Sequence, residues 1–257
     1  MKLAYLVVLI TAFTSLSGCT KDYSLAPPAD SEQITVTIKV PDQLKAESMR
    51  VMYRSKICTF INHTASGEPY KRDGYRKIDL QPVRRGESDL YEAKLAVDGG
   101  GACQWRLSNV TFGVVYKDPT VFGENVTFGA GGGVVVVFDN NDSSRGGMGK
   151  KVEGDLTIRK DYYPWVDEDF LGEYQKTINL VGEVETYFEY QALQARNLYF
   201  EPVLHTDFVL YSAGPKEKRK GNYPVFVFPD GSVVDDGRPN SKFLKLQAIR
   251  KLSEANK

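Results

Sequence analysis

The chain has 257 residues, with 33 Lys and Arg side chains against 33 Asp and Glu side chains, so its formal net charge is zero. Nucleic-acid-binding proteins usually carry a basic stripe and an overall basic charge, so this balance argues against nucleic acid as a partner. The length is sufficient to bury a sizeable core in one or two domains.

Residues 1–18 have the pattern of a secretory signal peptide. Lys2 supplies a positive charge, the segment 3–13 is apolar apart from Thr11, and small residues follow it. A helix that crosses a bilayer needs roughly 20 apolar residues, so this run is too short to be one. We therefore expect residues 1–18 to be removed on export.

Cys19 completes the sequence Leu16-Ser17-Gly18-Cys19, which resembles a bacterial lipobox. In lipobox proteins the Cys sulfur receives a diacylglyceryl group, the chain is cut before the Cys, and the new amino terminus is acylated. Several acyl chains hold a protein stably on a membrane, whereas one chain holds it only marginally. The resemblance implies lipidation of Cys19, and Thr20 in place of Asp implies an outer-membrane location facing the periplasm. A plain signal peptide with an incidental Cys is the alternative.

The segment from the anchor to the first strand is polar and contains a Pro-Pro pair. Such a composition is typical of a linker. We expect residues 19–32 to form the lipidated Cys and a flexible tether that lifts a folded domain off the membrane.

Alternating apolar and polar residues predict β-strands through most of the region 33–240. In the first such segment the apolar residues share one face, as half-buried strands require: Ile34, Val36, Ile38 and Val40. Many short strands separated by turns predict a mainly β fold, an antiparallel β-sandwich. A division near 140–150 into two packed subdomains is an open alternative.

Two segments have helical patterns. Residues 187–198 are compatible with a short helix. At the C-terminus, residues 241–257 have Ser241 as an N-cap candidate and apolar residues at helical spacing, which predicts a C-terminal helix or tail.

Cys58 and Cys103 are the two cysteines that remain once Cys19 is set aside. In an oxidising compartment they form one disulfide, which stabilises the fold by roughly 4 kcal/mol through loop-closure entropy. Two unpaired buried thiols are the alternative. Neither cysteine lies in a CxxC pair, and His63 and His205 are the only histidines, so we expect no metal and no cofactor.

Two loops carry weak signals for ligands. The glycine-rich run 129–137 precedes a strand instead of opening a helix, so it predicts close backbone packing and not a phosphate-binding loop. The segment from Asp139 to Asp142 offers oxygen ligands of the kind Ca²⁺ uses, without the spacing of an EF-hand. We expect a solvated loop there, with Ca²⁺ binding as the alternative.

His205 and Asp207 form the one pair that suggests a catalytic dyad, because residues two apart in a strand share a face. No serine sits in a GxSxG elbow, and no free activated cysteine remains beside a base. We therefore expect a structural His205, no catalytic residues and no enzyme activity.

The stretch 160–170 places aromatic residues among acidic ones, a combination found at protein interfaces. Tyr162 and Trp165 are accordingly the candidate partner-binding residues, and packing at the end of the sandwich is the alternative. The basic run 216–221 predicts a solvated hairpin tip, which an acidic partner could also use.

Three blocks, together with the lipobox, resemble a family of bacterial lipoproteins: GGGACQWRLSNVTFGVVYKD (99–118), GAGGGVVVVFDNN (129–141) and DYYPWVDEDFLGEY (161–174). These lipoproteins are encoded beside phospholipase effectors of the type VI secretion system and serve as immunity proteins on the periplasmic face. The resemblance implies that this chain binds and neutralises a secreted phospholipase effector, and it transfers no individual interface residue. A structural or assembly lipoprotein of the envelope and an enzyme with an unrecognised site are the alternatives.

Overall fold

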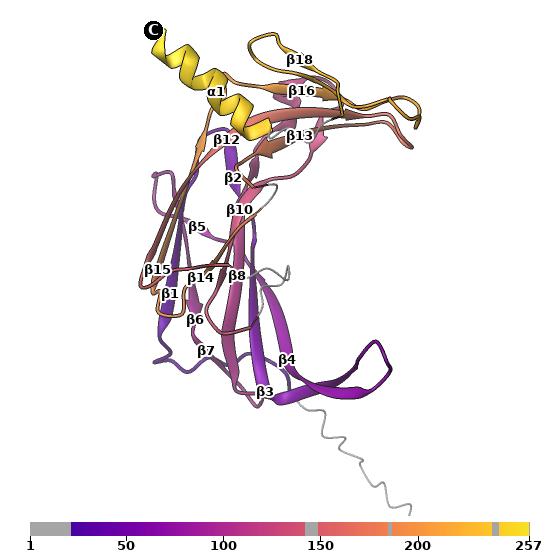
Figure 1. The fold of residues 1–257 in the computed structure, drawn as a ribbon. Helices are drawn as coiled ribbons and strands as arrows, with labels where there is room; N and C mark the ends of the chain where they lie inside the picture. Colours follow the sequence, from indigo (N-terminus) through magenta and orange to yellow (C-terminus); the bar gives the residue numbers. More distant parts are fainter. Residues whose placement is uncertain (1–21, 142–148, 185–186, 238–241, 257) are drawn as a thin grey trace, which may run out of the picture.

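The computed structural model describes residues 22–141, 149–184, 187–237 and 242–256. The protein is mostly β, with 52% of residues in strands and 8% in helices, and two mixed sheets pack together with one short C-terminal helix (Figure 1). The expected mainly β sandwich with a C-terminal helix is confirmed.

The elements follow one another along the chain as β1 (Gln33–Lys39), β2 (Leu44–Ala46), β3 (Met49–His63), β4 (Pro69–Leu80), β5 (Val83–Arg84), β6 (Leu90–Ala96), β7 (Asp98–Gly100), β8 (Trp105–Tyr116), the 3-10 helix η1 (Pro119–Phe122), β9 (Thr127–Phe128), β10 (Gly132–Val137), β11 (Lys150–Lys151), β12 (Leu156–Asp169), β13 (Gln175–Val181), β14 (Tyr187–Gln191), β15 (Asn197–Leu204), β16 (Leu210–Ala213), β17 (Val225–Val227), β18 (Val233–Val234) and the helix α1 (Lys242–Ala255).

The first sheet has the strand order β18-β17-β16-β12-β15-β1-β6-β5, with β13 beside β12 and β9 beside β13. The second has the order β11-β14-β10-β8-β3-β4, and β2 and β7 both pair with β8. The sheets are mixed and not antiparallel throughout, because β15 runs parallel to both β1 and β12, and β14 runs parallel to β10. The alternation of side chains sets the buried face of a strand but not its direction.

The two halves of the chain share both sheets. From the second half, β15 pairs with β1 in one sheet, and β14 pairs with β10 in the other. The alternative of two subdomains divided near 140–150 therefore does not describe this pairing. The expected helix at 187–198 is also wrong, because most of that segment forms β14 and the start of β15, where pairing with β10 and β1 outweighs the local helical pattern.

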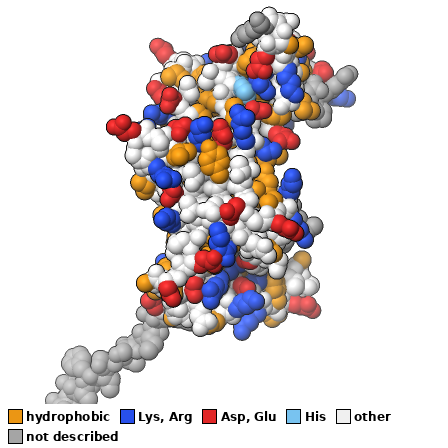
Figure 2. Space-filling model, turned by 90° about the vertical axis from the view of Figure 1, so that its left-hand side faces the viewer, with side chains coloured by type: hydrophobic (Ala, Val, Ile, Leu, Met, Phe, Trp, Pro, Cys, Tyr) orange, Lys and Arg blue, Asp and Glu red, His pale blue; other side chains and the backbone are white. Residues whose placement is uncertain are grey.

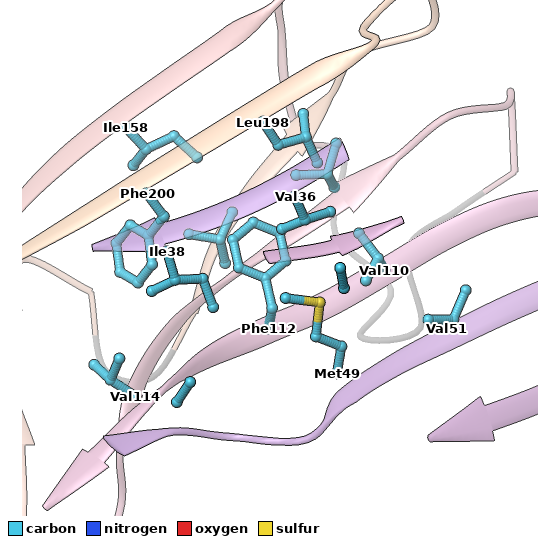
Figure 3. Packing of buried hydrophobic residues seen from close by; sticks show 14 of the residues in the cluster. Val36, Ile38, Met49, Val51, Val110, Phe112, Val114, Ile158, Leu198 and Phe200 are labelled. Carbon is cyan, nitrogen blue, oxygen red and sulfur yellow. The ribbon is translucent and has the colours of Figure 1, made fainter. Parts of the chain in front are cut away.

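The core lies between the inner faces of the two sheets. Figure 3 shows Val36 and Ile38 of β1 and Phe200 of β15 facing Met49 of β3 and Phe112 of β8, all at most 1% exposed. The rings of Phe112 and Phe200 meet edge to face at 6.1 Å between centroids. Burial of each such side chain contributes about 1.5–3 kcal/mol, so this interdigitation holds the sheets together.

The glycine-rich run brings the two sheets close together at one point. A Cβ atom on Gly132 of β10 would lie 2.1 Å from Cε1 of Tyr162 in β12, so only glycine fits against this ring. The run therefore serves close packing, as its position before a strand predicts.

A smaller second cluster lies at the end of the molecule that carries α1 (Figure 1). Phe243 and Leu246 of the helix pack with Tyr163 and Leu210 of the first sheet and with Phe228, which follows β17. The helix thus covers one face of the part of the sheet built from β12, β16 and β17. Ser241, the N-cap candidate, lies outside the described residues.

The strands β3 and β4 continue beyond the second sheet as a two-stranded arm, residues 55–75, which we call the β3–β4 arm. Up to Arg54, β3 pairs with both β4 and β8, and beyond it the register partners of β3 are on β4 only. Cys58 and Cys103 form the expected disulfide at the base of this arm, with their Cα atoms 5.3 Å apart. The bridge ties the arm to the turn that precedes β8.

The described chain begins at Asp22, and its first residues pack against the body of the protein. Trp105 donates a hydrogen bond from Nε1 to the carbonyl oxygen of Tyr23, 3.1 Å away. Ala26 forms a parallel bridge with Gly100. The expected tether 19–32 is therefore held to the protein in its second half, while Cys19 lies outside the described residues.

Candidate functional site

Tyr162, one of the two expected partner-binding residues, is a core residue. Its side chain is 1% exposed, and its ring meets that of Phe200 edge to face. Burial raises the pKa of its hydroxyl above the ordinary value of 10.0. The choice of Tyr162 as an anchor is corrected accordingly, because no surface of this side chain is open to a partner.

Trp165 of β12 is half-buried, and its ring contacts Lys242, the first residue of α1. It donates a hydrogen bond from Nε1 to Oγ of Ser212 at 2.7 Å, and that hydroxyl in turn donates to Asp167. The ammonium nitrogen of Lys242 lies 3.5 Å from the ring centroid, which is a cation–π contact. These contacts give Trp165 a structural role, and its role in binding a partner stays a prediction.

His205 does not pair with Asp207. It follows the end of β15 and begins a turn, in which the amide of Phe208 donates to its carbonyl oxygen, so the same-face argument for a strand does not apply. The imidazole Nε2 instead lies 2.8 Å from Oδ1 of Asp161 in β12. The ring stacks on Tyr163 with centroids 4.9 Å apart.

The pair formed by His205 and Asp161 belongs to a network that fastens α1 to the sheet. Arg250 of α1 places Nη2 3.7 Å from Oδ2 of Asp161 and donates from Nε to the hydroxyl of Tyr163 at 3.0 Å. Burial raises the pKa of Tyr163, and the hydrogen bond from Arg250 opposes this shift. The network thus has an evident structural purpose.

The other face of the same part of the sheet carries a row of exposed apolar side chains. Register pairs place Tyr211 beside Val166, Val227 beside Tyr211, and Val233 beside Val227, and register partners point to the same face. Val225 lies on this face as well, because it pairs with the residue two positions after Tyr211. We call Tyr211, Val225, Val227 and Val233 the β16–β18 stripe.

The stripe is the exposed continuation of a core face. Val166 is 1% exposed, whereas Tyr211 is 48%, Val227 is 40% and Val233 is 58% exposed. Burial of apolar area is favourable at about 25 cal/mol per Å², so an exposed apolar row of this kind marks a surface that a partner can cover.

A cleft of about 420 Å³ opens on the same face of β12. It is lined by Pro164, two residues before Val166 in the strand, and by Thr206, Val121 and Phe122. Val121 is 71% exposed at the rim. The cleft makes this part of the face concave, and none of its lining residues belongs to the stripe.

The basic run 216–221 belongs to the loop that joins β16 to β17, and its residues are exposed. It contains four basic side chains and one acidic side chain. The prediction of a solvated hairpin tip is confirmed. Because the loop connects two strands of the stripe, it sets a positive charge beside the apolar surface.

The rest of the surface gives a useful contrast. Figure 2 shows the outer side of the sheet that contains β1 and β15, where Lys and Arg side chains are interspersed with Asp and Glu. One such pair joins Lys39 to Glu201 at 3.3 Å. Mixed charge of this kind is typical of a solvated face, so this face is a weaker candidate for a binding surface than the stripe.

The candidate metal ligands do not converge in the described part of the chain, where no group of three or more His, Cys, Asp or Glu side chains could hold an ion. Asp139 accepts hydrogen bonds from the backbone and side-chain amides of Asn141. Asp142 lies outside the described residues, so the Ca²⁺ alternative at 139–142 is neither supported nor contradicted.

The stripe was missed in the sequence because its strands are short. The segments 210–213, 225–227 and 233–234 have two to four residues each, too few for a clear period-two pattern. The unbroken apolar run at 225–228 indicates a strand with two apolar faces, but it does not say which face α1 covers.

Comparisons with protein-family models, with curated proteins and with solved structures give no match to this chain. Among the helices that the structure describes, none is both long and apolar enough to cross a membrane.

Proposed function

We propose that this protein is a lipid-anchored lipoprotein of the outer membrane that faces the periplasm, where it binds and neutralises a secreted phospholipase effector. The single observation that carries the proposal is the β16–β18 stripe, an exposed apolar row on an open sheet face. The lipobox at Cys19 and the resemblance of three sequence blocks to immunity lipoproteins supply the location and the class of partner.

The stripe suits a protein partner better than a small molecule. It is spread over three strands and bordered by the basic loop 216–221, whereas a small-molecule site is concave and encloses its ligand. Stable protein complexes bury roughly 1,200–2,000 Å², with a few residues, most often Trp, Tyr or Arg, contributing most of the affinity. Tyr211 and Val227 are the central candidates, and the basic loop favours a partner with acidic groups beside its own apolar patch.

Attachment to the membrane serves inhibition of a lipase. A phospholipase attacks lipids at the bilayer surface, and an inhibitor anchored there meets the enzyme at a raised local concentration. The anchor at Cys19 therefore supports the function without contributing to the interface.

The test has two arms. Bacteria that express the full chain are challenged with a cognate phospholipase directed to the periplasm, and survival is compared with that of cells lacking the protein. In parallel, the purified protein is mixed with the lipase, and complex formation and phospholipid hydrolysis are measured.

We expect survival, a stable complex and suppressed hydrolysis. Survival equal to that of cells without the protein, with no complex in solution, contradicts the proposal. Turnover of a substrate by the purified protein alone would support the enzyme alternative. Loss of outer-membrane integrity on deletion, without any lipase, would support an assembly role.

A further inference from the structure

The β3–β4 arm contains three Lys and Arg side chains, Lys56, Lys71 and Arg72, and two acidic side chains, Glu68 and Asp73, a net charge of +1. Three further basic side chains lie just beyond its base: Arg54, Arg76 and Lys77. The arm also exposes large apolar side chains: Ile57 (49%), Phe60 (36%), Ile61 (60%), Tyr70 (41%) and Tyr75 (61%). Cationic and aromatic residues are thus exposed together on one protruding element.

One side of the arm forms a small aromatic cluster. The rings of Phe60 and Tyr75 meet edge to face at 5.7 Å, and the guanidinium carbon of Arg72 lies 6.0 Å from the centroid of the Phe60 ring. Asn62 donates a hydrogen bond to the Tyr70 hydroxyl at 3.1 Å. On the opposite side Ile61 pairs with Lys71, so both faces combine apolar and cationic groups.

The arm is held rigidly although a two-stranded hairpin is marginally stable in water by itself. The Cys58–Cys103 disulfide fixes its base, where the register of β3 against β4 shifts. Ser55 reinforces the site, because its hydroxyl donates to the carbonyl oxygen of Cys103 and accepts from the amide of Cys58. Gly74 completes the packing, since a Cβ there would lie 1.7 Å from the carbonyl oxygen of Cys58.

The same disulfide connects the arm to the point where the described chain begins. Cys103 places Sγ 3.9 Å from the carbonyl oxygen of Asp22, and Trp105 holds Tyr23 by a hydrogen bond. The chain before this point contains the apolar run 3–13 and the lipobox Cys19. Cys19, where the proposed lipid anchor attaches, is therefore only three positions in the sequence before Asp22, which lies at the base of the arm.

We propose that the β3–β4 arm lies on the surface of a bilayer that contains anionic phospholipids. Tyrosines favour the membrane–water interface, where an apolar ring and a polar hydroxyl are both satisfied, and Lys and Arg are attracted to anionic headgroups. The α1 end, which carries the β16–β18 stripe, lies at the opposite end of the molecule from the turn of the arm (Figure 1). The arm therefore orients the protein so that the stripe faces away from the bilayer.

This inference rests on the membrane attachment in the proposed function, and not on the phospholipase as partner. It is tested with the full lipidated chain in vesicles of phosphatidylethanolamine and phosphatidylglycerol whose acyl chains carry bromine, which quenches nearby Trp fluorescence. Ile61→Trp places a reporter on the arm. Val233→Trp, at a similarly exposed position in the β16–β18 stripe, is the matched control. Trp105 and Trp165 are present in every variant, so their emission is subtracted with the unsubstituted protein.

We expect brominated lipid to remove most of the emission added by Ile61→Trp and little of that added by Val233→Trp. Introducing Lys71→Glu and Arg72→Glu into the Ile61→Trp protein should reduce the quenching to the level of the control. The same charge reversal at Lys218 and Arg219, in the loop between β16 and β17, should leave it unchanged. Circular dichroism and an intact disulfide in each variant exclude unfolding as the cause.

Protein that floats with the vesicles but shows no quenching at position 61 overturns the inference and leaves the membrane attachment standing. Protein that does not float overturns both. A change in Ile61→Trp emission on adding the phospholipase, with none on adding lipid, would assign the arm to a protein partner and also overturn the inference. The survival assay described above tests neutralisation of the phospholipase separately. A failure of that function therefore does not affect the inference about the arm, and a failure of the inference does not affect that function.

Discussion

Arg250 in α1 donates a hydrogen bond from Nε to the hydroxyl of Tyr163 in β12, 3.0 Å away, and thereby joins the C-terminal helix to the sheet. Tyr163 stacks on His205, which pairs with Asp161. Below this polar network, Leu246 is fully buried at the helix–sheet contact. The helix covers one sheet face and leaves the other, with the β16–β18 stripe, exposed.

Leu246→Ala is expected to lower the free energy of unfolding by about 2–5 kcal/mol, because it removes a fully buried side chain and leaves a cavity. Leu252→Ala in the same helix is the matched control, since that side chain is 66% exposed and its loss should cost less than about 0.5 kcal/mol. Urea denaturation followed by circular dichroism measures both. Equal effects of the two changes would show that α1 is not docked as described.

Replacing Cys58 and Cys103 with Ser is expected to lower the free energy of unfolding by about 4 kcal/mol through the loop-closure entropy of the unfolded chain. The two residues are 45 positions apart. Exchange of the most protected amides with deuterium should accelerate throughout the sandwich, because the unfolded chain gains entropy. Amides of the β3–β4 arm should accelerate more than those of β8, because the bridge also fixes the base of the arm. An arm that accelerates no more than β8 would contradict this local role.

Asp155 is expected to make the stability of the protein depend on pH in the acid range. Its carboxylate accepts hydrogen bonds from the side chain of Asn197 at 2.7 Å and from the backbone amides of Arg196 and Asn197, each at 2.8 Å. The side-chain hydrogen bond from Asn197 is the largest of the effects that lower the pKa of Asp155 below its ordinary value of 3.8. Such a group stabilises the fold above its unfolded-state pKa and loses that effect as the pH falls through the lower folded-state pKa.

Asp155→Asn should therefore reduce stability at neutral pH, and its difference from the unsubstituted protein should shrink as the pH falls below 3.8. Denaturation midpoints over this pH range measure the effect. A difference that stays constant with pH would mean that the lowered pKa contributes nothing to stability.

Val227→Asp is expected to weaken binding of the phospholipase by at least about tenfold, because it places a charge at the centre of the apolar stripe. Val83→Asp is the matched control, since Val83 is 70% exposed on β5 at the other edge of that sheet. Affinity is measured by calorimetry and folding by thermal denaturation. Equal affinities for the two variants would place the interface elsewhere.

Trp165→Ala separates the structural from the binding role of that residue. Loss of its contacts with Ser212 and Lys242 should lower thermal stability. Selective loss of affinity with unchanged stability would instead restore Trp165 as an interface residue.

Cys19→Ala is expected to abolish lipidation, so that the protein becomes soluble in the periplasm or stays uncleaved at the inner membrane. Metabolic labelling with palmitate and membrane fractionation measure this outcome. A labelled variant that still fractionates with the outer membrane would contradict the lipobox interpretation.

Local pattern was sufficient for the features that depend on neighbouring residues or on simple counting. The alternation at 34–40 identified the buried face of β1, and the apolar spacing after residue 241 identified α1. Two remaining cysteines allowed a single intramolecular pair, and that pair forms. In each case the physical determinant lies within a few residues of chain or in the redox chemistry of cysteine.

The tertiary structure alone decided which strands meet and therefore which side chains stay exposed. Parallel pairing with β10 drew residues 187–191 into a strand, and packing against Gly132 buried Tyr162. His205 pairs with Asp161, 44 residues earlier in the chain, and not with Asp207. The exposure of the stripe and of the arm also depends on tertiary contacts. The stripe is exposed because α1 covers the opposite face of those strands, and the arm is exposed because the pairing of β3 with β8 ends at Arg54. Such contacts join residues far apart in the sequence, and a period-two pattern carries no information about the partner strand.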